Sequence, residues 1–296
     1  MQLPALPSRH HDGHKGTFGS VCVIGGQRSE DGVVMVGAPA LTANAAMRSG
    51  CGKVMLAMSR PILQTALSMS PTSTGIELPI DEVGRLIPSA SMEAIDTHAA
   101  GCRCLAIGPG FGCGWAQQQI ISTCISKEDR PVILDADGLN ALSLLESGQL
   151  ELKAPTILTP HLGEFQRLAH AMRIDVDVSN LVSSAEALAQ AYGCIVVLKS
   201  ATTVITDGVQ TVESDSGSVV LATGGTGDVL TGIIAGLLAQ YGVDCISHLF
   251  DAAVLGVNIH AEAGEAYAVE HGRTGMLATD LLERIPDAIS SLHCQP

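Results

Sequence analysis

The chain has 296 residues, of which 46% are apolar, 16% are charged and 32 are glycines. Its 30 acidic and 16 basic residues give a net charge of −14, and no basic run occurs, which argues against nucleic-acid and anionic-membrane partners. The low charged fraction also argues against disorder. We expect one domain over residues 1–296, with a loose or extended segment at 1–13.

The nine cysteines are odd in number and contain no C-x-x-C pair, and most lie inside apolar runs. This usage indicates free thiols in a reducing compartment. The first residues have no apolar core of a signal peptide, and no run of 18 apolar residues occurs anywhere. A cytoplasmic protein without a transmembrane helix is therefore expected.

Short, unbroken apolar runs recur along the chain and end in glycine or a polar residue. Such runs are typical of strands buried on both faces of a sheet. Strands are expected at 21–26, 53–58, 104–110, 131–137, 156–161, 195–199 and 203–206. Helices are expected at 39–48, 163–172, 180–192, 227–240 and 244–269.

The alternation of strands and helices predicts an α/β fold, with a mostly parallel sheet covered by helices on both faces. Residues 200–214 break the alternation, and the Asp-Gly pair in TDGV predicts an antiparallel hairpin there. Ligands of an open α/β sheet bind at the carboxyl ends of its strands. The polar and glycine-rich strand ends are therefore the candidate site.

The strongest functional signal is ATGGTGDVLTG, which leads into a predicted helix. Its glycines let the free N–H groups of the helix start surround an anion, so Gly224, Gly225, Thr226 and Gly227 form a candidate anion hole. Asp228 behind them could take a proton from an attacking hydroxyl, or it could simply cap the helix. The helix dipole should keep this carboxylate ionised at neutral pH.

Two other strand ends carry acidic side chains. In DADGLNAL, Asp137 could cap a helix, and with Asp135 it could position a substrate or metal. In TPHLGEF, the strand end fixes His161 at the ligand edge, where it is either structural or functional. Glu164 would lie in the first turn of the next helix, where it suits the dipole or could hold a water or Mg²⁺.

The remaining glycine-rich stretches are less specific. GPGFGCG does not have G-x-G-x-x-G spacing, so it is either a tight turn or a backbone edge close to a ligand. In the N-terminal HHDGHKGTFG the histidine spacing matches no familiar metal site, and Lys15 with Gly16 and Gly19 is a candidate phosphate contact. No P-loop and no G-x-S-x-G motif occurs in the chain.

In this order, HKGTFG, GPGFG, DADGLN, TPHLGEF, ATGGTGDVLTG and GMLATDLLERIP resemble the ADP-dependent NAD(P)H-hydrate dehydratases of the ribokinase-like superfamily. The resemblance runs from His14 to about Pro286. It implies repair of (S)-NADHX and NADPHX, in which ADP, or ATP in some members, phosphorylates the ring hydroxyl. Phosphate then leaves, giving NADH or NADPH, AMP and phosphate, and Mg²⁺ is expected to help.

The resemblance also implies a homotetramer, with the alanine-rich helix from Pro39 as a hypothetical contact between subunits. The epimerase domain fused to this one in some family members is not expected in this chain. A separate NAD(P)HX epimerase is expected to act alongside it.

Roles carry over to the matching positions. Asp228 is implied as the catalytic acid–base residue and a substrate contact, together with substrate contacts from Ala38, Gly110 and His161. Nucleotide contacts are implied for Lys199, Ser200, Ala201, Thr202, Thr203 and Gly227. The family pattern K-G-x-G-T reads KSATT here, with Ser200 and Thr202 in place of two glycines, so the choice between ADP and ATP stays open.

Two other functions share these motifs. A ribokinase-like kinase of a sugar or vitamin precursor would also use Asp228 and the anion hole, but it would release a phosphorylated product. A nucleotide sensor without catalysis would gain by losing the charge of Asp228, so the intact aspartate argues against it.

Overall fold

The computed structural model describes residues 3–29, 31–145 and 152–293. The strands are β1 (Ser20–Ile24), β2 (Gln27–Arg28), β3 (Val34–Met35), β4 (Lys53–Ser59), β5 (Thr74–Leu78), β6 (Cys104–Ile107), β7 (Val132–Leu134), β8 (Thr156–Leu158), β9 (Ile195–Leu198), β10 (Thr203–Thr206) and β11 (Thr211–Ser214). The helices are α1 (Gly37–Arg48), α2 (Arg60–Met69), α3 (Pro88–His98), α4 (Trp115–Ile125), α5 (Asp137–Ser143), α6 (Leu162–Ala171), α7 (Leu181–Tyr192), α8 (Thr226–Gln240), α9 (Leu249–His271) and α10 (Ala278–His293).

Within the described residues, the main sheet has nine strands in the order β11-β10-β9-β8-β7-β6-β1-β4-β5. The pairs from β9 to β5 are parallel, whereas β10 pairs antiparallel with both β9 and β11. The predicted α/β class, the buried parallel strands and the hairpin near TDGV are therefore confirmed. The edge strand β5 and the small hairpin of β2 and β3 were not predicted from the sequence.

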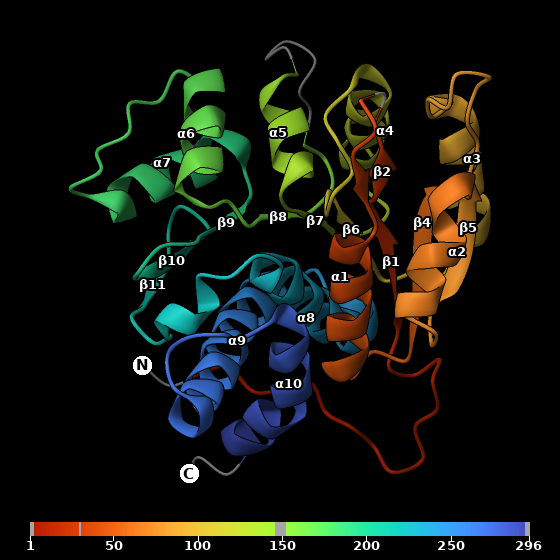
Figure 1. The fold of residues 1–296 in the computed structure, drawn as a ribbon. Coiled ribbons are helices and arrows are strands. Elements are labelled where there is room, and N and C mark those ends of the chain that lie inside the picture. The colour runs from red at the N-terminus through yellow and green to blue at the C-terminus, as the bar shows by residue number, and fades with distance from the viewer. Residues whose placement is uncertain (1–2, 30, 146–151, 294–296) are drawn as a thin grey trace.

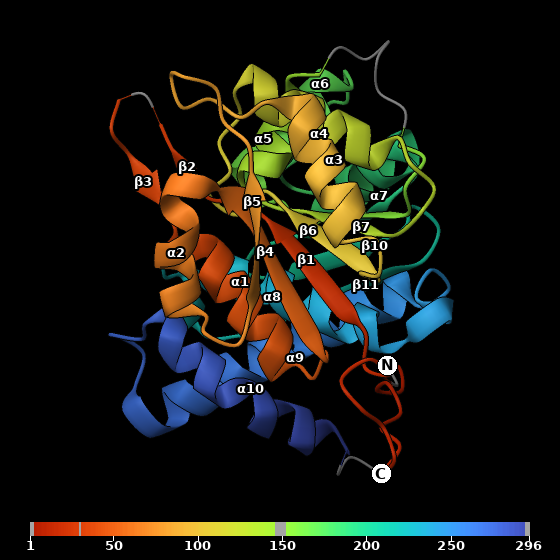
Figure 2. The same ribbon diagram turned by 90° about the vertical axis from the view of Figure 1, so that its right-hand side faces the viewer.

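Helices cover both faces of the sheet (Figure 1). One face carries α3 to α7, and the other carries α1, α2 and α8 to α10. A separate apolar cluster fills the space on each side, because side chains of the buried strands point alternately to the two faces. Figure 2 shows the hairpin of β2 and β3 beside α2, beyond the end of β1.

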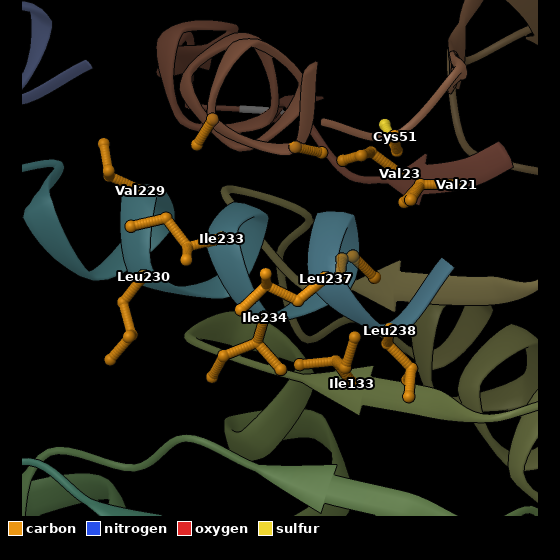
Figure 3. Close-up of a cluster of buried hydrophobic side chains, with 14 of the residues drawn as sticks. Val21, Val23, Cys51, Ile133, Val229, Leu230, Ile233, Ile234, Leu237 and Leu238 are labelled. Atoms are coloured by element: carbon orange, nitrogen blue, oxygen red, sulfur yellow. The ribbon is translucent and has the colours of Figure 1, made fainter. Parts of the chain in front are cut away.

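Helix α8 is the central helix of its layer and is buried along nearly its whole length. Its side chains pack against β1 and β7, as Val21, Val23 and Ile133 show in Figure 3. A helix that is apolar all round is typical of a protein core. The position of α8 therefore fixes Asp228, which lies in its first turn.

The alanine-rich helix α1 packs closely on α8. A Cβ atom added to Gly232 would lie 2.3 Å from the carbonyl oxygen of Thr42, and one on Gly236 would lie 2.5 Å from that of Ala46. Ala43, Ala45 and Ala46 are buried inside the chain, so this face of the helix is not free for another subunit, and a subunit contact through the rest of the helix stays a prediction. The small side chains of α1 allow α8 to approach closely.

Two further features bear on the expectations from sequence. The last long helix was expected from residue 244, but residues 242–244 form a short 3-10 turn and α9 begins at Leu249. All eight cysteines that the structure describes are free, and seven of them are buried. None of the helices in the described part of the chain is both long and apolar enough to cross a bilayer.

Candidate functional site

A buried ion pair lies where β7, β9 and α8 meet. Asp135 follows β7 and Lys199 follows β9, and the Lys199 ammonium donates to Oδ1 of Asp135 at 2.8 Å. The hydroxyl of Thr231 in α8 donates to Oδ2 of Asp135 at 2.9 Å. A Cβ atom on Gly227 would lie 3.2 Å from Nζ of Lys199, so the start of α8 faces this lysine directly.

Burial opposes the charge of both partners, but their attraction is stronger. Despite the loss of hydration, Lys199 and the hydroxyl donors hold the pKa of Asp135 below its usual value. Burial likewise acts to lower the pKa of Lys199, and the carboxylates of Asp135, Glu164 and Asp228 raise it above the usual value. The site therefore contains a fixed positive charge, which suits a phosphate ligand.

Asp228 is the third residue of α8, and it does not cap the helix. The cap position is Gly225, whose φ of 94° requires glycine, and no side chain bonds to the helix start there. The capping alternative for Asp228 is therefore wrong. The carboxyl group is left to face the site.

The pKa of Asp228 is raised to about 7 by burial first and then by the charge of Asp135, against the lowering effect of Lys199. The expectation of a fully ionised carboxylate at neutral pH is thus wrong for the ligand-free protein. Desolvation and neighbouring acids outweigh the helix dipole. A pKa near the working pH is what an efficient general base requires.

The backbone, rather than a hydroxyl, faces the candidate anion hole. Thr226 is buried, and its hydroxyl donates to the carbonyl oxygens of Leu221 and Thr223 at 2.7 and 2.9 Å, away from the ligand side. Behind the loop, Nε2 of His260 lies 2.9 Å from the carbonyl oxygen of Thr226. Gly224 is exposed with open space beside it. The predicted set therefore offers main-chain N–H groups on a braced loop.

His161 is the cap of α6. Its Nδ1 accepts from the N–H groups of Gly163 and Glu164 at 3.0 and 3.3 Å, so a neutral ring carries its proton on Nε2. Glu164 completes a capping box by accepting from the His161 N–H at 2.9 Å. Burial, followed by the charges of Lys199 and Arg167, lowers the pKa of His161. His161 therefore has a structural role as the cap of α6, and its half-exposed ring can still contact a ligand.

Glu164 is poorly placed to bind a metal ion. It is buried, one carboxylate oxygen accepts from the His161 N–H, and the other lies 3.2 Å from Nε2 of the same residue. Burial also raises its pKa. Among the residues that the structure describes, no group of three or more His, Cys, Asp or Glu side chains could hold a metal ion.

The glycine loop after β6 brings Gly110 to Ala38. A Cβ atom on Gly110 would lie 3.6 Å from the Ala38 Cβ and 3.0 Å from that of Met35 in the small hairpin. Asp137 does not cap α5, as the sequence suggested, because Ala136 is the cap residue. Instead, the carboxylate of Asp137 accepts from the N–H of Gly112 at 2.8 Å and holds the loop.

The nucleotide segment that follows β9 connects it to β10. Lys199 remains tied to the sheet, since its N–H donates to the carbonyl oxygen of Pro160 at 2.8 Å. Ser200 and Ala201 are exposed at the bend, and Thr202 and Thr203 are half-buried. The Ser200 hydroxyl donates to the carbonyl oxygen of Thr202. The two side chains that replace family glycines therefore lie at an open turn beside the ion pair.

The predicted phosphate contact at Lys15 is wrong, because this segment lies at the opposite end of the sheet. A Cβ atom on Gly19 would lie 2.1 Å from the carbonyl oxygen of Ala239, near the last turn of α8. Asp228 lies in the first turn, and a 15-residue helix is about 22 Å long. Lys15 precedes β1, and a residue before a parallel strand lies at the edge opposite to the carboxyl end of that strand.

Three polar residues that hold this arrangement were not predicted from the sequence: Thr42, Thr231 and His260. Thr42 of α1 donates to the carbonyl oxygens of Ala38 and Asp228, both at 3.1 Å, and so links α1 to α8. Each is a polar residue within an apolar helix, and that contrast was the only available signal. Their partners on other elements, Asp228, Asp135 and Thr226, lie far away in sequence.

The fold is ribokinase-like, and its site brings together a helix start, a carboxylate and a largely buried lysine. Ribokinase from Thermotoga maritima has the same fold, with 14% identity and a TM-score of 0.52 over 92% of this chain and 99% of that one. The family model described as NAD(P)H-hydrate dehydratase matches residues 21–287, and the chain belongs to this family. The resemblance noted in the sequence is confirmed.

Individual relatives agree with this assignment. The ADP-dependent (S)-NAD(P)H-hydrate dehydratase of Neisseria meningitidis serogroup B is 34% identical over 93% of this chain and 86% of its own length. The bifunctional NAD(P)H-hydrate repair enzyme Nnr of Salinibacter ruber is 33% identical over 95% of this chain but only 50% of its own length. The chain thus spans about half the length of the bifunctional relatives.

Among solved structures, the ADP/ATP-dependent NAD(P)H-hydrate dehydratase of Bacillus subtilis, crystallised with ATP and Mg²⁺, has a TM-score of 0.74 and 28% identity. This likeness covers 97% of this chain and 94% of that one.

Proposed function

We propose that this protein converts (S)-NADHX and NADPHX to NADH and NADPH, using ADP or ATP as the phosphoryl donor. The observation that carries the proposal is Asp228, a carboxyl group of pKa about 7 in the first turn of α8, beside the Lys199–Asp135 pair. A base, an anion-binding helix start and a fixed cation are the parts that phosphoryl transfer requires.

In the first step, Asp228 accepts the proton of the hydrate's ring hydroxyl while that oxygen attacks the terminal phosphorus of ADP. The new O–P bond forms as the bridging P–O bond breaks, and AMP leaves with the electron pair. In the second step, phosphate leaves C6 with the C–O electrons, C5 loses a proton, and the C5–C6 double bond returns. The net change is hydrate plus ADP to reduced cofactor, AMP and phosphate.

The chain's own groups bind and orient the reactants. We assign Ala38, Gly110 and His161 to the hydrate, Gly227 and residues 199–203 to the nucleotide, and the backbone from Gly224 to Gly227 to the transferring phosphoryl group. Lys199 offsets negative charge on the phosphates without leaving Asp135. Because the described residues form no metal-binding cluster, Mg²⁺ is proposed to enter bound to the nucleotide phosphates, as is usual for this ion.

The direct test is incubation with NADHX and either ADP or ATP, following the return of the absorbance of reduced nicotinamide and the formation of AMP or ADP. We expect NADH to appear only when a nucleotide is present. A stable phosphorylated product without NADH would instead identify a small-molecule kinase. Comparing the rates with the two nucleotides tests which phosphoryl donor the protein prefers, a choice that the KSATT segment leaves open.

A homotetramer, a partner NAD(P)HX epimerase and a cytoplasmic location stay proposals supported by the family resemblance and the free thiols. Because the alanine face of α1 is buried within the chain, a tetramer must use other surfaces. Light scattering of the purified protein tests the mass directly.

A further inference from the structure

Helix α9 presents one polar ring to the loop that forms the candidate anion hole. Nε2 of His260 lies 2.9 Å from the carbonyl oxygen of Thr226, 34 residues earlier in the chain. A carbonyl oxygen can only accept, so Nε2 must carry the proton of the ring. Burial lowers the pKa of His260 to about 4, so at neutral pH the ring is uncharged and has this one proton to donate. Neither of the two steps proposed for the reaction uses His260.

The position of His260 is set by the close packing of α9 on α8 and on the turn before it (Figure 1). Gly256 and Gly264 lie one helical turn before and after His260, on the same face of α9. A Cβ atom on Gly256 would lie 2.5 Å from Cγ1 of Ile234, and one on Gly264 would lie 2.9 Å from Cδ2 of Leu221. A larger side chain at either glycine would push α9 away, so the two glycines keep the ring against the loop.

The carbonyl group that His260 contacts belongs to the same peptide unit as the N–H of Gly227. A trans peptide is planar, and its C=O and N–H bonds point in opposite directions. The hydrogen bond from Nε2 to the Thr226 oxygen therefore also fixes the direction of the Gly227 N–H. It polarises the peptide as well, which makes that N–H a stronger donor.

The Gly227 N–H is available to a ligand. In the part of the chain that the structure describes, neither this group nor the N–H of Asp228 has an acceptor in the protein, as is usual in the first turn of a helix. A Cβ atom on Gly227 would lie 3.2 Å from Nζ of Lys199, so the free N–H groups lie beside a fixed positive charge. An anion bound there would contact both.

The loop needs a brace because it is rich in glycine. Gly224, Gly225 and Gly227 surround Thr226, and glycine leaves the backbone more freedom than any other residue does. Thr226 is the fixed point of the loop: its hydroxyl donates to the carbonyl oxygens of Leu221 and Thr223, and its own carbonyl accepts from His260. The bond from His260 is the one that orients the peptide on the ligand side.

We propose that His260 is a positioning residue for phosphoryl transfer. By donating from Nε2 to the Thr226 carbonyl, it keeps the Gly227 N–H aimed at the terminal phosphate of the nucleotide. Donors that are aimed in advance at the transferring group lower the barrier of the reaction. The inference rests on the proposed function, because His260 acts through the anion hole assigned there.

The affinities for two nucleotides test this role without any turnover. ADP carries the terminal phosphate that the hole would bind, whereas AMP lacks it. In His260→Phe, which keeps a flat ring but has no donor, calorimetry should show ADP binding weakened about tenfold and AMP binding unchanged. His260→Gln should restore the affinity for ADP, because its amide N–H can take the place of Nε2–H. An unchanged ADP affinity in His260→Phe would overturn the proposal, and so would an equal loss for both nucleotides, which would indicate a general loosening of the site.

Kinetics with NADHX test the same role in the reaction. In His260→Phe, kcat should fall about 10- to 100-fold, less than for outright removal of a donor, with KM for NADHX unchanged. Asn258→Leu is the matched control, since Nδ2 of Asn258 donates to the Val254 carbonyl within α9 itself, and its kcat should equal that of the wild type. A raised KM for NADHX at unchanged kcat would contradict the positioning role.

Two further outcomes are separated by design. If His260→Phe does not fold, His260→Asn gives the same comparison with His260→Gln, because both carry an amide and the shorter side chain does not reach Thr226. If the wild type had no dehydratase activity, the proposed function would fail, and the ADP and AMP affinities would still decide the role of His260.

Discussion

At the scale of single residues, Asp228 should determine how activity depends on pH. Only the ionised carboxylate can take the hydroxyl proton, and its pKa is raised to about 7. We therefore expect kcat/KM for NADHX to rise through about pH 7 and to level off above it. Rates measured from pH 5.5 to 9 test this, and a profile that falls with rising pH across this range would contradict it.

Removing the Asp228 carboxylate should leave binding intact and stop the reaction. Asp228→Asn keeps the size of the side chain but cannot accept the proton, so kcat should fall by about 100- to 10,000-fold. The step near pH 7 should disappear as well, with KM for ADP nearly unchanged. Asp251→Asn, an acid in the first turn of α9, is the matched control. Near-normal turnover of Asp228→Asn would show that Asp228 is not the base that accepts the hydroxyl proton.

Asp135 should tune Asp228 without touching the substrate. Its charge raises the pKa of Asp228, and its loss would also leave Lys199 less neutralised, so both effects lower that pKa in Asp135→Asn. The pH–rate step should move to lower pH. Thermal unfolding should show a loss of about 3 kcal/mol, because a buried ion pair has lost one charge. A step that stays in place would show that Asp135 does not set the pKa.

At the scale of elements, the cap of α6 separates the structural from the binding role of His161. Asn is a good N-cap, so His161→Asn should keep the stability of the protein but raise KM for the hydrate. His161→Ala should raise KM for the hydrate and should also lower the stability of the protein by about 1 kcal/mol. Equal KM values for the hydrate in the wild type and in His161→Asn would show that His161 caps α6 but does not bind the hydrate.

The contact between α1 and α8 should be sensitive to a single methyl group. In Gly236→Ala the new Cβ atom would lie 2.5 Å from the carbonyl oxygen of Ala46 and 2.9 Å from the Ser49 Cβ. Overpacking of this kind costs about 1–3 kcal/mol, which calorimetry would register as a lower Tm. Gly101→Ala is the control, since open space surrounds that position and its Tm should be unchanged.

The elements that the sequence predicted are those with one clear pattern. β1, β4 and β6 to β9 are short buried runs, and the Asp-Gly turn marks the hairpin of β10 and β11. Helices α2, α3, α4 and α10 were not predicted from the sequence. β5 was missed because TGIEL alternates and is too polar for a buried run, as an edge strand allows.

The same contrast holds for the site. Strand ends and the helix start placed Asp228, Gly227 and Lys199 at one edge, because topology alone brings those positions together. The pKa of Asp228 could not be predicted in the same way. It depends on burial and on Asp135, which are tertiary facts, and these outweigh the local effect of the helix dipole.

At the scale of the whole molecule, one partly buried histidine, His260, should make the fold sensitive to acid. Burial lowers the pKa of His260 to about 4, although its contact with Thr226 opposes this shift. A lowered histidine pKa stabilises the fold fully above the unfolded value of about 6.5, and this contribution is lost as pH falls toward 4. Urea unfolding should therefore show a stability loss of at most about 3 kcal/mol over this range. Substitution by Gln should remove most of that loss, and an unaltered pH dependence would contradict the assignment.

The net charge of −14 should affect how both substrates arrive, because each is an anion. Long-range repulsion is screened over a Debye length of about 10 Å at 0.1 M salt, whereas Lys199 and the amides of α8 act at contact distance. We expect KM for ADP to fall modestly as KCl rises from near zero to about 0.15 M, with Mg²⁺ in constant excess and kcat unchanged. A KM that climbs steadily from the lowest salt concentration would mean that local cations, rather than the field of the whole protein, govern the encounter.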